Sequence, residues 1–113
     1  MKAASPAVTP FQERVYRELT GIPEGRVTTY KLLAEQLGCR SCQAVGQALR
    51  RNPFAPKVPC HRVVASDLTI GGFAGDRSGP AIRRKLALLA REGVQFRGGK
   101  LVDAARVYRF GRA

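Results

Sequence analysis

The sequence has no tryptophan, one histidine and one methionine, and only three cysteines. An odd number of cysteines argues against a disulfide framework. No segment is apolar over the length that a membrane span needs, and the first ten residues hold no apolar run that could act as an export signal. We therefore expect a protein that is not secreted and keeps its thiols free, cytoplasmic or, in a eukaryote, nuclear.

Acidic residues are also scarce. Eight Asp and Glu stand against 20 Lys and Arg, a formal net charge of +12 on 113 residues. Such a surplus attracts polyanions, so nucleic acid is the first partner that the composition indicates. A membrane-surface partner would need an apolar anchor or an amphipathic basic helix as well, and neither is evident, so we expect no membrane partner. The 44% hydrophobic content suffices for one small domain with an ordinary core.

Caps and apolar spacing predict four helices. Thr9-Pro10-Phe11-Gln12 is typical of a helix start, with a cap, a proline in the first turn and a glutamine three residues after the cap. We expect further helices to begin after Thr28 or Thr29, at Ser41 and at Pro80. Short extended pieces are expected at 26–28 and 63–64.

The chain divides into three parts. Residues 1–8 are predicted to be a flexible tail, residues 9–96 the functional domain, and residues 97–113 a basic tail or a short hairpin around Gly98-Gly99. The proline-rich stretch 52–60 must be an irregular loop, and the glycine-rich stretch 66–79 is predicted to be a mobile loop over the surface.

The second and third predicted helices meet through a four-residue joint, which is helix-turn-helix spacing. Many small helical hairpins share this spacing, so it indicates DNA binding only weakly. Small residues recur in the second of these helices at Ala44, Gly46 and Ala48. The glycine is explained equally well by close helix packing and by a fit to the narrow minor groove.

A cysteine adjoins the only histidine behind a rigid proline loop, at Cys60 and His61. We expect Pro59 to begin a short helix whose N–H groups and dipole favour the thiolate of Cys60, with His61 taking the thiol proton directly or through a water. The competing interpretation is a buried cysteine that happens to precede a surface histidine.

The wider sequence decides between these interpretations. The segment Pro59-Cys60-His61-Arg62-Val63 resembles the active-site signature of the O6-alkylguanine-DNA alkyltransferases, and the resemblance runs from about Phe11 to Phe96. Other matching segments are Gly25-Arg26-Val27-Thr28-Thr29-Tyr30, Ala44-Val45-Gly46 with Asn52-Pro53, and Leu88-Leu89-Ala90-Arg91-Glu92-Gly93. The resemblance implies a mainly α, winged helix-turn-helix domain with short β segments, in a compact form without the family's amino-terminal domain.

The resemblance also implies catalytic roles. Cys60 would be the nucleophile, His61 its base through a water, and Glu92 the group that orients the imidazole. Tyr30 would give a proton or hydrogen bond to the departing guanine oxygen. Asn52 would brace the hinge between the recognition helix and the active-site loop.

A substrate pocket follows from the same resemblance. Tyr30, Val63, Phe73 and Ala74 would line it, and backbone groups near Val63 and the loop through Phe73 and Ala74 would bind the guanine edges. Arg62 would be a buried structural charge rather than a DNA contact. Phe73-Ala74 stands where the family often has Tyr-Ser, and the following loop is longer than usual, so substrate preference should differ. With Cys60 and His61 assigned, no complete zinc ligand set remains, and we expect neither metal nor cofactor.

The predicted DNA contacts depart from the family at one position. Gln43 stands where the family usually inserts an arginine into the base stack, so either Gln43 fills the gap more weakly or Arg40 reaches in, and lesion capture should be slower. The full set of predicted DNA-binding residues is Gln43, Arg40, Ala44, Gly46, Arg50 and Arg51.

The pair Cys39 and Cys42 has three interpretations: packing at the helix entry, redox sensitivity, and metal binding. No second ligand pair accompanies it, which favours packing.

The sequence thus predicts a direct-reversal repair enzyme that transfers one alkyl group from O6-alkylguanine in double-stranded DNA to Cys60 and is consumed. We expect it to act as a monomer that can cluster on DNA. The main alternative is an alkyltransferase-like protein that binds the lesion and hands it to nucleotide excision repair, although that group characteristically replaces the reactive cysteine. A basic winged-helix regulator and a cysteine hydrolase are more distant alternatives.

Overall fold

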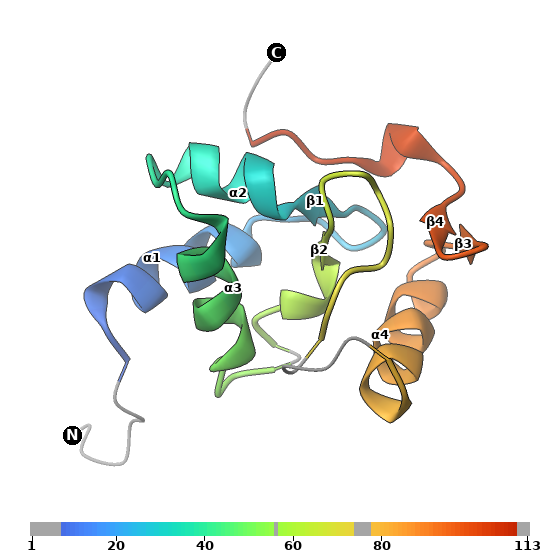
Figure 1. The fold of residues 1–113 in the computed structure, drawn as a ribbon, viewed down its shortest axis with the longest axis horizontal. Helices are drawn as coiled ribbons and strands as arrows, with labels where there is room; N and C mark the ends of the chain where they lie inside the picture. Colours follow the sequence, from blue (N-terminus) through green and yellow to red (C-terminus); the bar gives the residue numbers. More distant parts are fainter. Residues whose placement is uncertain (1–7, 56, 74–77, 111–113) are drawn as a thin grey trace.

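The computed structural model describes residues 8–55, 57–73 and 78–110. Four α-helices account for most of the regular structure in this part of the chain (Figure 1). They are α1 (Pro10–Thr20), α2 (Tyr30–Gln36), α3 (Cys42–Arg50) and α4 (Pro80–Arg91). The short elements are the strands β1 (Thr28–Thr29), β2 (Val63–Val64), β3 (Phe96–Arg97) and β4 (Lys100–Leu101), and the 3-10 helices η1 (Cys60–Arg62) and η2 (Ala104–Arg106).

Side-chain caps set where three of the helices begin. At the start of α1, the backbone N–H of Gln12 donates to Thr9 Oγ1 and the backbone N–H of Thr9 donates to Gln12 Oε1, each over 3.1 Å. Thr29 caps α2 and Ser41 caps α3 in the same way, again at 3.1 Å. Each hydroxyl satisfies a backbone donor that has no partner within the helix. The predicted starts of these helices are confirmed.

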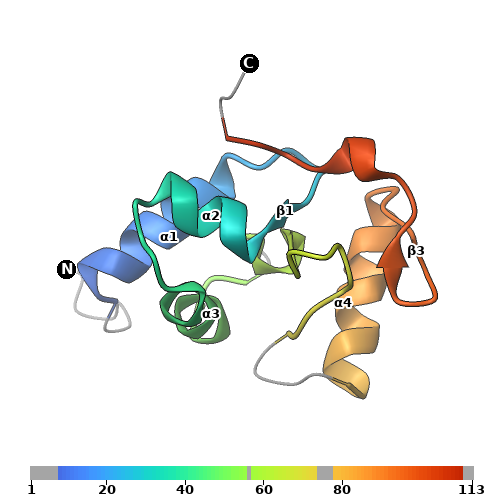
Figure 2. The same ribbon diagram turned by 45° about the horizontal axis from the view of Figure 1, so that its top comes forward.

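A short parallel pairing joins the first half of the chain to the active-site segment. β1 lies beside β2, with Thr28 opposite Val63 and Thr29 opposite Val64. The pairing fixes the start of α2 next to η1, which immediately precedes β2. Helices α1, α2 and α3 gather on one side of this pair and α4 lies on the other (Figures 1 and 2).

Two apolar clusters form the core. The larger one lies under the helix-turn-helix and reaches Cys60 and Val63; the smaller one contains Val64 and Leu89 and lies beneath α4 and the C-terminal segment. Each cluster contains one residue of β2, Val63 in the larger and Val64 in the smaller, so burial on both sides fixes the strand that follows η1. No helix within the described residues is long and apolar enough to cross a membrane.

The segment after residue 96 packs onto the body of the protein. β3 and β4 form an antiparallel hairpin around Gly98 and Gly99, whose φ angles of 58° and 81° suit a tight turn. The chain then returns to the edge of β1, where the Val27 N–H donates to Arg106 O over 2.9 Å. The sequence left open a basic tail or a short hairpin for this segment, and the structure has the hairpin.

Candidate active site and nucleic-acid interface

A cavity of about 700 Å³ opens between α3 and the loop that follows β2. Its walls come from the start of α2, one face of α3, η1 and the loop 65–73. The lining residues are Tyr30, Cys42, Gln43, Gly46, Gln47, Leu49, Arg50, Cys60, Ala65, Ser66, Ile70, Gly71, Gly72 and Phe73. The predicted nucleophile, Cys60, therefore shares one cavity with the helix predicted to enter DNA.

Cys60 lies at the start of η1 and is only 8% exposed. Burial raises the pKa of its thiol, and this outweighs the opposing effects of the Asn52 amide and the positive charge of Lys85. The expectation that a helix dipole lowers the pKa of Cys60 is wrong for the free protein, because η1 has only three residues and desolvation dominates. At neutral pH the resting group is the thiol, so a base is needed to make the nucleophile.

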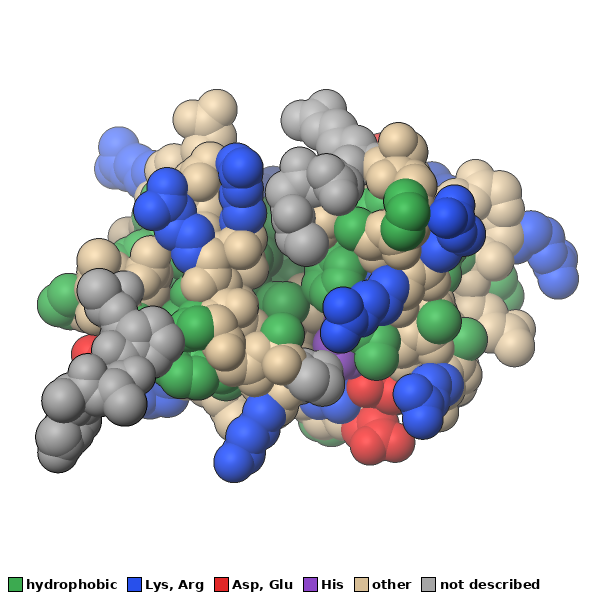
Figure 3. All heavy atoms as spheres, turned by 90° about the horizontal axis from the view of Figure 1, so that it is seen from below, with side chains coloured by type: hydrophobic (Ala, Val, Ile, Leu, Met, Phe, Trp, Pro, Cys, Tyr) green, Lys and Arg blue, Asp and Glu red, His purple; other side chains and the backbone are tan. Residues whose placement is uncertain are grey.

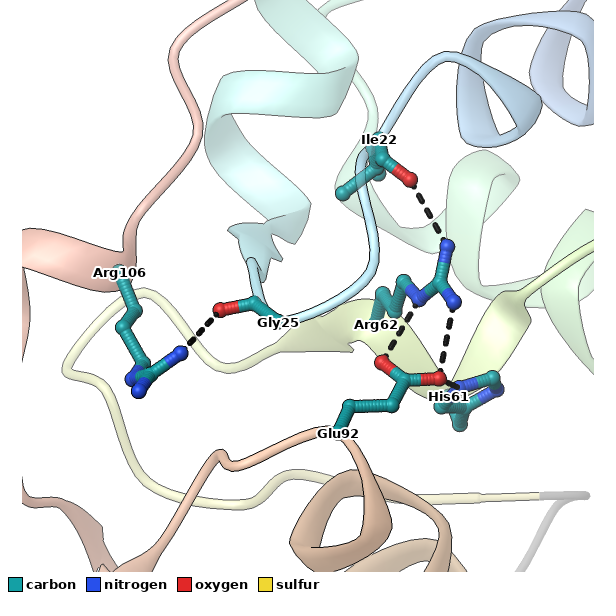
Figure 4. Close-up of polar contacts among 6 residues, drawn as sticks. All are labelled: Ile22, Gly25, His61, Arg62, Glu92 and Arg106. Carbon is teal, nitrogen blue, oxygen red and sulfur yellow. Dashed lines mark hydrogen bonds and ion pairs between the residues drawn. The ribbon is translucent and has the colours of Figure 1, made fainter.

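His61, Glu92 and Arg62 form a hydrogen-bonded group beside Cys60 (Figure 4). His61 Nε2 lies 2.9 Å from Glu92 Oε2, and Arg62 donates from Nε to Oε1 over 2.9 Å and from Nη2 to Oε2 over 2.8 Å. Arg62 Nη1 also donates to the carbonyl of Ile22 over 2.8 Å. Burial acts to raise the pKa of Glu92, but the hydrogen bonds from Arg62 and His61 outweigh it and the pKa is lowered. A charged Glu92 therefore holds the imidazole in one orientation.

The other ring nitrogen of His61 is free to accept a proton. His61 is 3% exposed, and its Nδ1 is buried with no hydrogen-bond partner among the described residues. Burial lowers the pKa of His61, more than the Glu92 carboxylate raises it, so the ring is neutral at pH 7. Because the carboxylate accepts from Nε2, the proton of the neutral ring sits on Nε2 and the lone pair on Nδ1. This is the protonation state that a general base requires.

Tyr30 brings a phenol into the same cavity. Its hydroxyl lies 3.4 Å from the carbonyl of Gly72, a weak contact that a better acceptor can replace. Burial raises the pKa of Tyr30, which keeps the phenol protonated. The loop passes close to the ring: a Cβ added at Gly71, where φ is 72°, would lie 3.4 Å from Tyr30 Cε2 and 3.2 Å from the Ala65 nitrogen.

Asn52 closes the loop between α3 and η1. Its Nδ2 donates to the Val58 carbonyl over 2.8 Å, and its Oδ1 accepts from the Phe54 N–H over 2.9 Å. Both bonds tie the proline-rich loop to itself immediately before Cys60. The side chain is placed where the predicted hinge brace would have to be.

Lys85 was not singled out from the sequence, yet it is a fully buried lysine beside the cavity, at 0% exposure. Its Nζ donates to the carbonyls of Val63, Ile70 and Gly72 over 2.7, 2.6 and 3.0 Å. Burial lowers the pKa of Lys85 to about 7. Its spacing in the sequence could have identified it as buried, because Lys85 falls between Ile82 and Leu89 on the buried face of α4.

The predicted pocket residues are only partly brought together. Phe73 and Tyr30 line the cavity, but Val63 is not among its lining residues. The Val63 carbonyl accepts from Lys85 and the Val63 N–H donates to the Cys60 carbonyl; the role of backbone groups near Val63 at the guanine edges stays a prediction. Ala74 lies outside the described residues.

The predicted DNA contacts divide in a similar way. Gln43, Gly46 and Arg50 line the cavity, whereas Arg40 and Arg51 are exposed outside it and Ala44 is half-buried. Gln47 and Cys42 also line the cavity and were missed; the spacing of Gln47 from Gln43 along one helix face could have identified it. Lys and Arg side chains are spread across the face in Figure 3, and Asp and Glu are few there.

Cys39 and Cys42 are both free thiols in this structure. The Cys39 sulfur lies 3.4 Å from the Ser41 nitrogen at the entry to α3. Within the part of the chain that the structure describes, no three His, Cys, Asp or Glu side chains are grouped to hold a metal ion. Redox sensitivity of this pair stays a prediction.

Comparisons with known proteins agree with this architecture. The family model for the DNA-binding domain of 6-O-methylguanine DNA methyltransferase matches residues 10–94. A methylated-DNA–protein-cysteine methyltransferase of Pyrobaculum aerophilum is 52% identical over 75 residues, which are 66% of this chain and 47% of that protein. A protein of the same name from Shigella flexneri is 45% identical over 86 residues, 75% of this chain and 47% of its own length. The chain therefore spans about half the length of the curated relatives it matches.

Two solved structures are similar in backbone. Mycobacterium tuberculosis OGT in complex with DNA has a TM-score of 0.68 at 40% identity, over 76% of this chain and 51% of that one. S. pombe Atl1 in complex with damaged DNA containing O6-carboxymethylguanine has a TM-score of 0.76 at 29% identity, over 91% of this chain and 98% of that one. These similarities confirm the predicted fold class and the predicted resemblance. With its residues 10–94 matching the family model, the chain belongs to the family of the 6-O-methylguanine DNA methyltransferase DNA-binding domain.

Proposed function

We propose that this protein repairs DNA directly by moving the alkyl group of O6-alkylguanine onto Cys60, once per molecule. The observation that carries the proposal is the arrangement around Cys60: a buried thiol in the wall of an open cavity, followed in sequence by a neutral histidine held by Glu92. Relatives that are named methylated-DNA–protein-cysteine methyltransferases support the same assignment.

The first step is removal of the thiol proton. His61 Nδ1 is the unpaired acceptor, and the bond from Nε2 to Glu92 stabilises the imidazolium that forms when Nδ1 takes the proton directly or through a water. Arg62 keeps Glu92 ionised through two hydrogen bonds. The thiolate of Cys60 is then exposed to a base that has been extruded from the duplex into the cavity.

The second step is displacement at the alkyl carbon. A sulfur–carbon bond forms as the carbon–O6 bond breaks, and the bonding electrons stay with the guanine. The guanine must gain a proton as it leaves, and the Tyr30 hydroxyl is the donor in the cavity. Tyr30 then regains a proton and His61 gives up the one it took from Cys60, so the net change is the transfer of the thiol proton to guanine. The thioether is not hydrolysed, so the protein acts once.

Double-stranded DNA is the partner in this proposal, with one chain acting on one lesion. The net charge of +12 attracts the phosphate backbone, and α3 presents the lining residues Gln43, Gly46 and Arg50 to the incoming strand. The solved structure of M. tuberculosis OGT in complex with DNA supports DNA as the partner.

Lesion binding without transfer is the second candidate function, favoured by the similarity to S. pombe Atl1 over 91% of this chain. In that case the complex would be handed to nucleotide excision repair. The retained thiol of Cys60, beside a base that is ready to accept its proton, argues for transfer instead.

Intact-protein mass spectrometry after mixing with O6-methylguanine duplex distinguishes the two functions. Transfer predicts a mass gain of one CH2 unit, because a methyl group replaces the thiol proton, and peptide mapping should place it on Cys60. Cys60→Ala should show no gain, whereas the matched variant Cys39→Ala, at a cysteine outside the cavity, should gain the full increment. Wild-type protein that binds the duplex and gains no mass contradicts transfer and supports lesion binding.

A further inference from the structure

The segment between α2 and α3 carries two cysteines that the proposed reaction does not use, Cys39 and Cys42. Hydrogen bonds fix the backbone on both sides of this segment. The Cys39 N–H donates to the carbonyl of Ala34 over 2.9 Å, which ties Cys39 to the end of α2. The Ala44 N–H donates to Ser41 Oγ over 3.1 Å, which caps α3 one residue before Cys42. Both thiols are therefore held in place by their neighbours.

Packing explains Cys39 but not Cys42. Cys39 is half-buried and contacts the larger apolar cluster, as a small apolar side chain would. Cys42 is the first residue of α3, and it is exposed and lines the cavity. Free cysteine is among the residue types most often buried in proteins, so an exposed thiol in a cavity wall is unusual. Of the interpretations that the sequence left open, packing accounts for only one of the two residues.

The thiol of Cys39 lies against the peptide group that joins Ser41 to Cys42. Its sulfur accepts from the Ser41 N–H over 3.4 Å and donates to the Ser41 carbonyl over 3.5 Å. That carbonyl is bonded directly to the Cys42 nitrogen, so the Cys39 sulfur is one peptide group away from the Cys42 backbone. A disulfide requires Cβ atoms about 3.8 Å apart. Turning the Cys42 side chain back over this peptide group brings its sulfur toward Cys39.

We propose that Cys39 and Cys42 are a redox site, in which peroxide forms a reversible disulfide that displaces the start of α3 and slows repair. The effect on repair rests on the proposed function. The exposed Cys42 sulfur attacks the peroxide, so that a sulfur–oxygen bond forms, the oxygen–oxygen bond breaks and one water leaves. The Cys39 sulfur then attacks the sulfenic acid on Cys42, and a second water leaves as the sulfur–sulfur bond forms. Together the two thiols lose two protons and two electrons, which the peroxide takes up.

The disulfide would act on α3 through the residues next to it. When the Cys39 sulfur bonds to Cys42, it leaves the N–H of Ser41, the cap residue of α3, and the Cys42 side chain leaves the cavity wall. Arg40 lies inside the closed ring, and Gln43 follows Cys42 on the cavity face of the helix. Both residues are predicted DNA contacts. Closing the ring therefore moves the part of α3 that meets DNA in the proposed function.

Cys60 should stay a free thiol under the same treatment. It is only 8% exposed, and burial raises the pKa of its thiol, so little of the nucleophilic thiolate is present. The competing explanation of Cys39 and Cys42 is two independent thiols that form no bond with each other. The two explanations differ in mass, because a disulfide removes two hydrogens from the protein and independent oxidation adds oxygen to each sulfur.

The test treats the reduced protein with a small excess of hydrogen peroxide and measures its intact mass and its single-turnover alkyl transfer from O6-methylguanine duplex. The mass should fall by two hydrogens, and peptide mapping should place the bond between Cys39 and Cys42. Transfer should slow about fivefold, the size of effect expected when the capped start of a helix is disturbed. Dithiothreitol, a dithiol reductant, should restore both the mass and the rate.

Cys39→Ser is the matched control, because it keeps an acceptor for the Ser41 N–H and cannot form the bond. Its transfer rate should match that of the reduced wild type, and peroxide should neither remove hydrogens from it nor slow it. Cys42→Ser cannot form the bond either, and its rates with and without peroxide replace this comparison if Cys39→Ser does not fold by circular dichroism.

Wild-type protein that loses no hydrogens, or that forms the bond and still transfers at the reduced rate, overturns the inference. So does slowing that dithiothreitol does not reverse or that Cys39→Ser shows equally, because the oxidation then acts elsewhere. The reduced wild type keeps the two claims apart. If it gains the alkyl mass on Cys60 and only the oxidised protein departs from these results, only this inference fails; if it gains no mass, the proposed function fails and the effect of the disulfide on repair fails with it.

Discussion

Replacing Gly46 by alanine separates stability from DNA recognition, because the two should change in opposite directions. The glycine lies inside α3, it is not among the glycines with positive φ, and an added Cβ meets no atom within 4 Å outside its helix. Gly46→Ala should therefore stabilise the protein by about 0.5–1 kcal/mol, because alanine loses less backbone freedom on folding. For a domain of this size that raises Tm by roughly 4 °C.

The same methyl group should slow repair. It would project from the cavity-lining face of α3, where the proposed function requires the helix backbone to come close to the edges of the bases in a narrow groove. We expect single-turnover transfer from methylated duplex to fall about tenfold, equivalent to about 1.4 kcal/mol of lost binding.

Gly21→Ala is the matched control for this substitution. Gly21 ends α1 at φ −80°, the nearest atom to an added Cβ is 3.5 Å away, and the residue is outside the cavity, so repair should be unchanged. A Gly46→Ala protein that is more stable and repairs DNA at the wild-type rate would refute the minor-groove explanation of this glycine. A Gly46→Ala protein that is less stable would refute the geometry of α3.

Three further substitutions test the chemistry. Glu92→Gln should slow transfer about 100-fold, because the amide cannot stabilise a protonated His61; single-turnover rates measured from pH 5.5 to 9 check this, and an unchanged rate and pH profile would count against the role of the carboxylate. Tyr30→Phe should slow transfer about 10- to 100-fold while Cys60 reacts with iodoacetamide as in wild type, and equal loss in both reactions would show that the phenol does not act on the guanine. Lys85→Met should remove a pH dependence of stability. Because the pKa of Lys85 is lowered to about 7 in the folded state and stays near 10.5 when unfolded, the unfolded state binds more protons between these values. The free energy of unfolding of the wild type should therefore rise from pH 7 to 8.5, by up to about 1.4 kcal/mol per pH unit, relative to the variant. Urea unfolding at several pH values measures this, and the same change of unfolding free energy with pH in both proteins would be the contrary result.

Local chemistry made the helices predictable from the sequence. The capping box at Thr9 and the hydroxyl cap at Ser41 depend on residues three positions apart, so the information lies in short stretches of chain. The return of the C-terminal segment to Val27 could not be predicted in this way. It rests on single backbone hydrogen bonds between residues about 80 apart, with strands too short to show an alternating pattern.

The site shows the same division between near and distant information. Cys60 and His61 are adjacent in sequence and were recognised from their motif, together with the roles that the resemblance implies. Lys85 was missed because its three carbonyl partners come from β2 and from the loop 70–72, well before it in the sequence. A lysine is also taken as polar when the apolar face of a helix is sought in a sequence, although Lys85 lies with Ile82 and Leu89 on the buried face of α4.

The two opposed pKa shifts at Cys60 and His61 have one physical cause and one consequence for the reaction. Burial disfavours charge, so it raises the pKa of the thiol and lowers the pKa of the imidazole. The resting pair is therefore neutral, and a neutral pair in a buried site avoids the desolvation cost of an ion pair. A protonated thiol is also a poor nucleophile, so Cys60 is protected from stray electrophiles while no substrate is bound. In the proposed reaction, proton transfer to His61 would create the reactive ion pair, and Glu92 would stabilise the imidazolium on the far side of the ring. If the protein reacts only once, as proposed, it gains most from this arrangement, because each thiolate formed without a substrate risks the loss of the molecule.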